Sequence, residues 1–236
     1  LRNAGEVDSG ELDRWLAREG IEVSCISTGQ VFAVSGLYFT HPELSIREQT
    51  FKVFKGLVDL AADHGKLINV GRARGSYRDD QPPEETERLF IDMARRICDY
   101  GADRGVTLMI EPVNRYEINF VNSVEQGARL LKRVERENIG LMPDVFHMNI
   151  EDRQVGGSLA EHAGLVKYVH LADSNRHAPG GAHLDFDDVF DGLARAGFDG
   201  WVSIEILPYP DPDSAARRAA EFILPRIEKY RPLVSV

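Results

Sequence analysis

The sequence predicts an α/β fold with a parallel sheet, and three observations support this prediction. Short aliphatic or β-branched runs alternate with longer segments of helical period along the whole chain. No low-complexity linker divides the chain, which indicates one domain over residues 1–236. The 236 residues are 43% hydrophobic, which is enough apolar material for the core of such a domain.

The strand-like runs are bounded by turn signals, and each pair is separated by a segment long enough for a helix. Such alternation is typical of successive βαβ units, in which neighbouring strands are parallel. The expected strands are Ile21–Ser27, Leu67–Gly71, Thr107–Val113, Ile139–His147, Val166–Ala172 and Trp201–Leu207.

Helix signals lie between these runs. A first helix is expected at about Gly10–Glu19, and a last one at about Ser214–Tyr230, before Pro232. Pro83 suits the first turn of a helix. Two residue pairs have the spacing of a capping box, and four glycines suit the left-handed position that ends a helix. These are Ser45 with Glu48, Ser123 with Gln126, Gly20, Gly65, Gly105 and Gly197.

Two architectures fit this order of elements: an open doubly wound sheet and a closed (β/α)8 TIM barrel. No Gly-x-Gly-x-x-Gly follows a strand, which disfavours a dinucleotide-binding open sheet. A barrel needs eight strands, typically in ~250 residues, and six are visible. The chain begins with Leu1 and has no strand before its first helix. We therefore expect an N-terminally incomplete barrel, without its first strand, its first helix and most of its second strand; a complete six-stranded open sheet is the alternative.

Composition excludes several functional classes. The 28 basic and 38 acidic residues give a net charge of -10, which disfavours a nucleic-acid partner because binding to phosphates needs basic surface. No run of 18 apolar residues could span a membrane. Cys25 and Cys98 are too far apart in sequence for a disulfide framework or a paired metal motif, so we expect a reducing, cytoplasmic environment.

Side-chain parity distinguishes the ends of four consecutive strands. Successive strand residues point to opposite faces, and in each strand one face is aliphatic while the other ends in an ionisable residue. These residues are Glu111, Asp144, His170 and Glu205. All four lie at carboxyl ends, where barrels build their active sites. Because three carboxylates gathered around one imidazole would repel one another strongly, we expect a divalent cation among the four residues. The donor set suits Mn²⁺, Mg²⁺ or Co²⁺ better than a thiol-rich zinc site would, and we expect Mn²⁺ among the three.

Each residue taken alone has a simpler interpretation. Glu111 could be solvated, Asp144 could be a turn residue after Pro143, and His170 could be a hydrogen-bonded core histidine. Glu205 is harder to explain, because charged side chains are seldom buried without a partner. The repeated parity favours one shared metal over four coincidences.

The sequence around these positions carries a family resemblance. The segments are Ile110–Glu117, Asp144–Met148, His170–Arg176 and Val202–Ile206. They resemble the ketose 3-epimerases, the D-tagatose and D-allulose 3-epimerase group of the xylose-isomerase-like TIM barrels. The resemblance covers most of the chain from Ile21 onward and is more specific for the superfamily than for the substrate.

The resemblance implies an isomerase that transfers a proton at C3 of a free ketose through an enediolate. It implies two acid/base glutamates on opposite faces of the sugar, Glu111 and Glu205. The implied metal ligands are Glu111, Asp144, His170 and Glu205, and the implied substrate-holding residues are Glu117, His147 and Arg176.

The remaining expectations concern substrate and partners. The Pro- and Asp-rich segment Pro208–Asp213 favours a neutral sugar over a sugar phosphate, because prolines lack backbone donors and aspartates repel anions. We also expect a homodimer or homotetramer. The alternatives are a hydroxypyruvate or inosose isomerase or dehydratase type of enzyme, and a non-catalytic metal-binding barrel. A related barrel endonuclease would need several zinc ions and a basic face, which the charge of -10 disfavours.

Overall fold

The structure is a computed structural model that describes residues 1–230. Its internal contacts divide the chain into two compact units. The first unit comprises Leu1–Ile110 and Arg129–Gly140, and the second comprises Glu111–Ala128 and Leu141–Val236. The expectation of one barrel domain over residues 1–236 stays a prediction.

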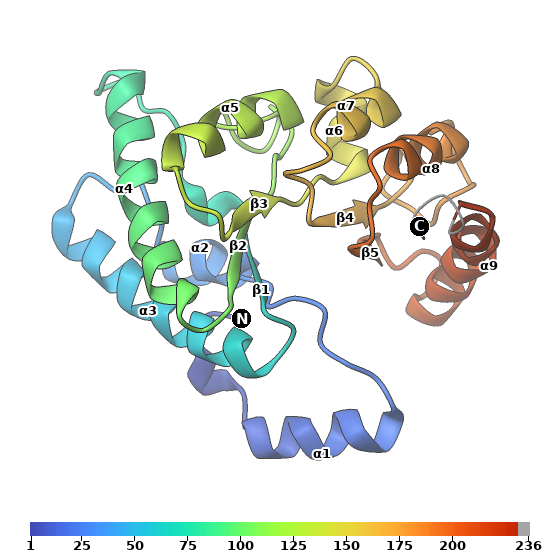
Figure 1. The fold of residues 1–236 in the computed structure, drawn as a ribbon, viewed down its shortest axis with the longest axis horizontal. Helices are drawn as coiled ribbons and strands as arrows, with labels where there is room; N and C mark the ends of the chain where they lie inside the picture. The colour runs from blue at the N-terminus through green and yellow to red at the C-terminus, as the bar shows by residue number, and fades with distance from the viewer. Residues whose placement is uncertain (231–236) are drawn as a thin grey trace. The chain divides into compact units, whose positions relative to one another are not determined.

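The first unit contains a three-stranded sheet in the order β1–β2–β3 (Figure 1). The strands are β1 (Leu67–Val70), β2 (Thr107–Ile110) and β3 (Ile139–Leu141), whose last residue belongs to the second unit. β1 and β2 are parallel, as expected for strands joined through a helix. β3 joins β2 through the Leu108 amide, which donates to the Asn138 carbonyl at 3.0 Å.

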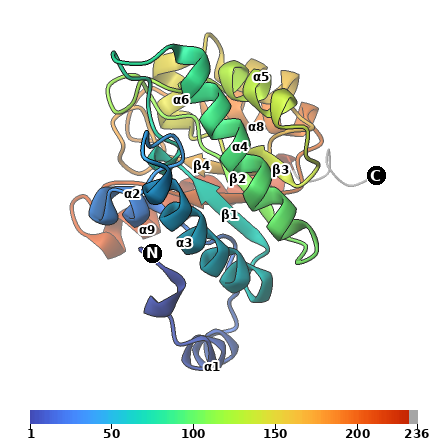
Figure 2. The same cartoon turned by 90° about the vertical axis from the view of Figure 1, so that its left-hand side faces the viewer.

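Long helices cover this sheet. The helices that lie wholly in the first unit are α1 (Ser9–Glu19), α2 (Gly29–Ser35), α3 (Leu44–Asp63) and α4 (Pro83–Ala102), with 3-10 helices at Ala4–Glu6 and Arg72–Arg74. α3 and α4 lie side by side and contact β1 and β2, respectively (Figures 1 and 2). Their inward faces are apolar and buried, for example at Phe54 and Phe90. α1 buries none of its residues.

The strand expected at Ile21–Ser27 is wrong in its extent. Only Ile26 pairs there, through an isolated parallel bridge to Ile68. Its amide donates to the Leu67 carbonyl at 2.9 Å, and its carbonyl accepts from the Asn69 amide at 3.2 Å. Ile21 is half exposed, so the apolar run lacks the covering layer that would extend the strand.

The second unit contains a two-stranded parallel sheet of β4 (Tyr168–Leu171) and β5 (Trp201–Ile204). Isolated parallel bridges, Leu141 to Val166 and Asp144 to His170, align the segment after β3 with β4. The helices of this unit are α6 (Val145–Glu151), α7 (Val155–Glu161), α8 (Phe186–Arg195) and α9 (Pro212–Tyr230), and α5 (Val124–Val134) has residues in both units.

α7 and α8 approach each other closely at two glycines. A Cβ added at Gly192 would lie 2.3 Å from the Gly156 carbonyl oxygen, so only glycine allows this contact. The Gly156 amide donates to a carboxylate oxygen of Asp188 at 2.8 Å, which holds the same crossing. The two helices therefore pack directly against each other within the second unit.

The other expected strands are present but shorter than predicted. The run expected at Ile139–His147 stops at Leu141, and α6 begins at Val145. Pro143 has no amide hydrogen for a ladder, and Asp144 caps the helix that follows. β2 likewise stops at Ile110, before Pro112. As a result, Glu111, Asp144 and Glu205 lie in the segments that immediately follow strands.

Most of the helix signals are confirmed. Pro83 begins α4, the first helix begins within one residue of its expected start, and the last begins two residues before its expected start. The four predicted glycines all have positive φ. The expected stop at Pro232 lies outside the described residues.

One of the two capping boxes is wrong. α3 begins at Leu44 with Glu43 as its N-cap, so Ser45 lies inside the helix and does not cap it. Ser123 does act as expected, because its hydroxyl accepts from the Gln126 amide at 3.2 Å. The Gln126 side chain, however, accepts from the Asn122 amide.

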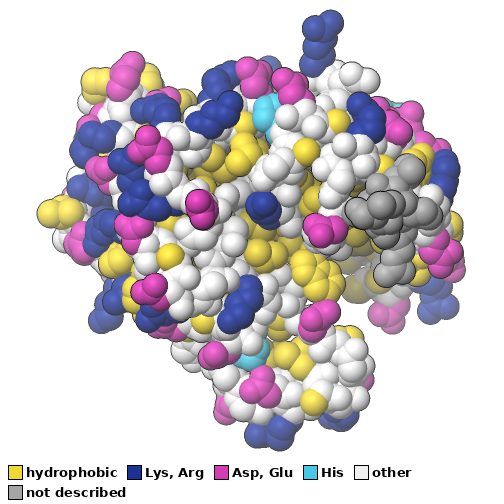
Figure 3. Space-filling view, in the orientation of Figure 1, with side chains coloured by type: hydrophobic (Ala, Val, Ile, Leu, Met, Phe, Trp, Pro, Cys, Tyr) yellow, Lys and Arg dark blue, Asp and Glu magenta, His cyan; other side chains and the backbone are white. Residues whose placement is uncertain are grey.

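Charged side chains on α4 are matched locally. Arg88 pairs with Glu85 at 2.6 Å, and Arg96 pairs with Glu48 of α3 at 2.7 Å. On the face drawn in Figure 3, Lys and Arg side chains lie among Asp and Glu side chains. Within residues 1–230, no helix combines the length and apolar character that crossing a membrane requires.

Candidate active site and metal centre

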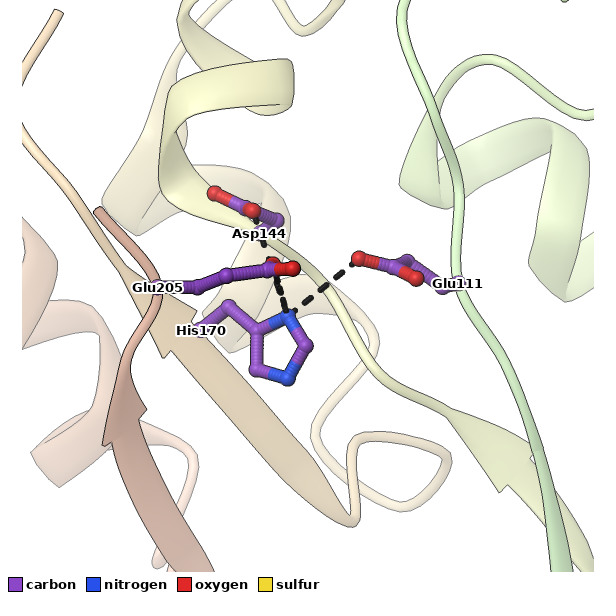
Figure 4. Close-up of side chains that lie close together, drawn as sticks. All are labelled: Glu111, Asp144, His170 and Glu205. Carbon is purple, nitrogen blue, oxygen red and sulfur yellow. Dashed lines mark hydrogen bonds and ion pairs between the residues drawn. The ribbon is translucent and has the colours of Figure 1, made fainter. Parts of the chain in front are cut away.

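The four residues identified by parity converge on one point of the second unit. One ligand atom from each of Glu111, Asp144, His170 and Glu205 lies within 4.8 Å of the others. Glu111 follows β2, Asp144 precedes α6, His170 lies in β4, and Glu205 follows β5. Figure 4 shows the four side chains pointing toward one another from these separate elements.

Backbone pairing sets this convergence. The His170 amide donates to the Pro143 carbonyl at 2.9 Å, which places His170 beside Asp144. The Glu205 amide donates to the Leu171 carbonyl at 3.2 Å, which places Glu205 at the same level. Because parallel strands end at one edge of a sheet, side chains of matching parity meet there.

The His170 ring is the centre of the cluster. Its Nδ1 lies 3.2 Å from Glu111 Oε1, 2.7 Å from Glu205 Oε2 and 3.9 Å from Asp144 Oδ2. Burial alone would lower the pKa of His170, but the hydrogen bonds to the two glutamates outweigh it and raise the pKa to about 11. The surrounding carboxylates therefore create a strong local preference for positive charge.

Asp144 uses its two carboxylate oxygens differently. Its Oδ1 accepts from the Phe146 amide at 2.9 Å and caps α6, whereas its Oδ2 faces His170 and Arg176. The side chain is completely buried, and this burial raises the pKa of Asp144 to about 7 against the opposing effect of Arg176. One oxygen is thus committed to the fold and the other is available to the cluster.

Arg176 lies against two of the predicted metal ligands. Its guanidinium pairs with Asp144 Oδ2 and, at 2.8 Å, with Glu205 Oε2. It also lies 4.8 Å from the ring of Phe146. Burial opposes ionisation of Glu205, but His170 and Arg176 together lower its pKa to about 2. The sequence predicted Arg176 as a substrate-holding residue, and its contact with the carboxylates was not foreseen.

Asp173 organises the loop that carries Arg176. Its carboxylate is buried and accepts hydrogen bonds from four backbone amides, at 2.8 to 3.2 Å. Burial would raise the pKa of Asp173, but these donors lower it overall. The Arg176 amide donates to the Asp173 carbonyl at 2.8 Å, so the loop is anchored on both sides of Arg176. The donors to the carboxylate are Ser174, Gly180, Ala182 and Leu184.

The other two predicted substrate residues meet through Asn114, a residue to which the sequence assigned no role. Asn114 Nδ2 lies 2.7 Å from His147 Nδ1 and 3.4 Å from Glu117 Oε1. Asn114 and His147 are both buried. The only signal in the sequence was the position of Asn114 between Glu111 and Glu117 in one motif.

A cavity of about 510 Å³ adjoins the Arg176 loop. It lies between residues 175–181 of this loop and the first half of α9, and the ring of His177 stacks on that of Tyr209 at 5.0 Å along its wall. The Leu207 amide donates to the Arg176 carbonyl at 2.8 Å, which ties this wall to the cluster. The residues that line this cavity do not include Glu111, Asp144, His170 or Glu205, so the cavity adjoins the loop and not the cluster itself.

The donor set fits a hard divalent cation. Three carboxylates and one imidazole nitrogen, all able to reach one point, suit an ion that prefers oxygen ligands and accepts one nitrogen. The two cysteines are not part of the cluster. The four residues together form a candidate binding site for a single metal ion.

Comparison with known proteins places these features in context. Residues 4–226 match the family described as "Xylose isomerase-like TIM barrel". The chain is 37% identical over 150 residues to a ketose 3-epimerase of Arthrobacter globiformis, covering 63% of this chain and 52% of that protein. It is also 37% identical over 202 residues to an L-ribulose 3-epimerase of Mesorhizobium japonicum. That match covers 85% of this chain and 67% of the relative. The chain thus spans between about half and two thirds of these two relatives.

A solved structure of an L-ribulose 3-epimerase is similar over nearly the whole chain. The TM-score is 0.84 at 26% identity, covering 98% of this chain and 84% of that one. Together with the family match, this similarity confirms the predicted α/β barrel class and the resemblance noted in the sequence.

Proposed function

The chain belongs to the xylose isomerase-like TIM barrel family, and on that premise we propose that it is a metal-dependent ketose 3-epimerase acting on a free sugar. The observation that carries this proposal is the convergence of Glu111, Asp144, His170 and Glu205 within 4.8 Å. The ketose and L-ribulose 3-epimerases that it resembles support the same reaction.

We propose that these four residues hold one divalent ion, with Mn²⁺ preferred and Mg²⁺ or Co²⁺ as alternatives. Charge balance supports a doubly charged ion. Three carboxylates carry three negative charges, and a divalent ion together with the Arg176 guanidinium carries three positive ones. When bound, the ion would polarise the substrate carbonyl and stabilise the enediolate charge.

The acid/base groups are Glu111 and Glu205. They approach the His170 Nδ1 from different strand ends, at 3.2 and 2.7 Å, so a sugar bound over this point would meet a carboxylate on each side. One glutamate removes the C3 proton and the other returns a proton to the opposite face. A single working base would return the proton to the face it came from.

Substrate oxygens are held by Glu117, His147 and Arg176. The guanidinium of Arg176 already lies beside Glu205, which places a donor next to one acid/base group. Glu117 and His147 share the Asn114 amide and so act as a pair.

We also propose a cytoplasmic enzyme that forms a homodimer or homotetramer and binds neither nucleic acid nor membrane. The wide spacing of Cys25 and Cys98 in the sequence and the net charge of -10 support this proposal. Sedimentation of the purified protein would measure its oligomeric state.

The decisive experiment is an assay of C3 epimerisation on unphosphorylated ketoses with added Mn²⁺. We expect turnover that a chelator abolishes and that Glu205→Gln lowers by about 10²–10⁴-fold. Glu161→Gln is a matched control, because Glu161 is exposed at the end of α7. Conversion of hydroxypyruvate without epimerisation of ketoses would assign the alternative isomerase activity, and metal binding without any turnover would assign a non-catalytic barrel.

A further inference from the structure

The Asn114 side chain lies between two residues that the proposed function assigns to the substrate. It is buried, with 2% of its surface exposed. Its Nδ2 is 2.7 Å from His147 Nδ1 and 3.4 Å from Glu117 Oε1. A buried amide that makes such a short contact with a ring nitrogen restricts which hydrogens that ring can carry.

A backbone hydrogen bond fixes the orientation of the amide. The Tyr116 amide N–H donates to Asn114 Oδ1 at 3.0 Å. An amide nitrogen of asparagine cannot accept such a bond, so the oxygen must face Tyr116 and the NH₂ group must face the other way. The turn that follows Glu111 therefore presents a donor, not an acceptor, to His147.

The donor determines the state of the ring. Because the Asn114 NH₂ group can only donate, His147 Nδ1 must accept, and it cannot carry a hydrogen. The proton of the neutral imidazole then lies on Nε2. His147 sits in the first turn of α6, which Asp144 caps, so its backbone position is also fixed.

We propose that Asn114 is a positioning residue that sets the tautomer of His147, so that Nε2–H donates to a substrate oxygen. The identity of that oxygen rests on the proposed function, whereas the tautomer does not. A carbonyl oxygen can only accept, so the opposite tautomer would place a lone pair against it. The amide of Asn114 thereby makes His147 a donor.

Nitrogen NMR of the ¹⁵N-histidine-labelled protein tests the tautomer directly. The signals of His147 are assigned by their loss in His147→Gln. We expect an unprotonated-type nitrogen at Nδ1 and a protonated-type nitrogen at Nε2. The reverse pattern in the unaltered protein would overturn the proposal, and this measurement does not depend on catalytic activity.

The sharpest variant is Asn114→Asp. It keeps an oxygen for the Tyr116 amide but replaces the NH₂ donor by an acceptor, so we expect His147 to gain a proton at Nδ1. Asn175→Asp is the matched control, because Asn175 Oδ1 accepts from the His177 amide two residues on in the same way, at 3.0 Å. Glu117→Gln should also leave the tautomer unchanged. An unchanged His147 spectrum in Asn114→Asp would overturn the proposal.

Activity provides the second measurement. If the protein epimerises ketoses, Asn114→Asp should lower kcat/KM about 10–100-fold, as expected for loss of a substrate hydrogen bond. A tautomer change with unaltered kcat/KM would overturn the positioning role alone. Absence of ketose turnover in the unaltered protein, with the expected tautomer present, would overturn the proposed function and leave the Asn114–His147 assignment in place.

Discussion

The two glutamates proposed to exchange the C3 proton have contrasting surroundings. The Glu111 side chain is 10% exposed, and its Oε1 lies 3.2 Å from His170 Nδ1. The Glu205 side chain is 49% exposed, and its Oε2 lies close to both His170 and Arg176. One carboxylate is enclosed, and the other is half exposed and paired with His170 and Arg176.

At Glu205, the contacts with His170 and Arg176 outweigh burial in setting ionisation. Burial raises the pKa of a carboxyl group, yet the pKa of Glu205 falls to about 2 because His170 and Arg176 stabilise its charge. We therefore expect Glu205 to be ionised at neutral pH before substrate binds. The loop that holds Arg176 contacts Glu205 and Asp144 through the guanidinium, whereas Glu111 begins the turn that carries Asn114.

The largest effects are expected from Glu111→Gln and Glu205→Gln, each lowering kcat for epimerisation by about 10²–10⁴-fold. Each variant should still exchange the C3 hydrogen of one epimer with D₂O, because the remaining glutamate faces only that epimer's C–H bond. Proton NMR of the recovered sugars measures this exchange at saturating Mn²⁺. If either variant exchanges the C3 hydrogen of both epimers equally, the two glutamates do not each act on one face of the sugar.

Removal of the metal ion should have the next largest effect. At an ion concentration of about 100 Kd, bound ion adds about 2.7 kcal/mol to the free energy of unfolding, and a chelator should remove this gain. Glu111→Gln should lose more of the gain than Glu205→Gln, because water can replace a half-exposed ligand more easily than an enclosed one. Thermal unfolding with and without Mn²⁺ measures both losses. A larger loss in Glu205→Gln than in Glu111→Gln would contradict the contrast between the enclosed and the half-exposed glutamate.

Asp173→Asn tests the loop on the Glu205 side. The amide NH₂ cannot accept, so some of the backbone donors on Asp173 lose their partner, and we expect a loss of about 1–3 kcal/mol at pH 7. Because folding lowers the pKa of Asp173, its contribution is present above the ordinary carboxyl pKa of about 3.9 and is lost as pH falls through the lower folded value.

Urea unfolding at pH 7 and near pH 3 measures this difference. The gap between the unaltered protein and Asp173→Asn should narrow at the lower pH. Asp213→Asn, at an exposed position of α9, is the control and should change the free energy of unfolding little at either pH. A gap that widens toward low pH would show that Asp173 is not ionised in the folded protein.

The smallest effect is expected on the Glu111 side, from Glu151→Gln. Arg115, four residues after Glu111, pairs with both carboxylate oxygens of Glu151 at 2.9 and 2.8 Å. The Arg115 side chain is 59% exposed, so the pair should contribute only about 0–1 kcal/mol, and less in high salt. Urea unfolding at two NaCl concentrations measures it. If Glu151→Gln lowered the free energy of unfolding more than Asp173→Asn does, the turn after Glu111 would contribute more stability than the Arg176 loop, which would contradict this prediction.

Much of the candidate site could be predicted because parity and strand ends are local properties of the sequence. Glu111, Asp144, His170 and Glu205 meet because each follows the aliphatic pattern of its own strand, and parallel strands end together. The same reasoning overestimated strand length, since it could not weigh Pro112 or Pro143 against the apolar residues around them.

The features of the site that the sequence did not predict depend on contacts between residues far apart in sequence. Asn114 and His147 are 33 residues apart, and nothing in either motif indicates which amide faces which ring. Arg176 reaches Asp144 from a backbone with φ of 64°, a conformation uncommon for arginine and not signalled by the residue type. Ile21–Ser27 fails as a strand for a similar reason, because only Ile26 finds a partner.

If the proposed ion binds, Asp144 would couple the identity of that ion to the position of His147. Its Oδ1 caps α6 while its Oδ2 faces the cluster, and His147 stands three residues further along the same helix. Exchanging the ion for one of different radius would pull or push this carboxylate, and the helix start would follow. Retuning the protein to a new metal should therefore require compensating substitutions in α6, so metal preference and sugar preference are expected to evolve together.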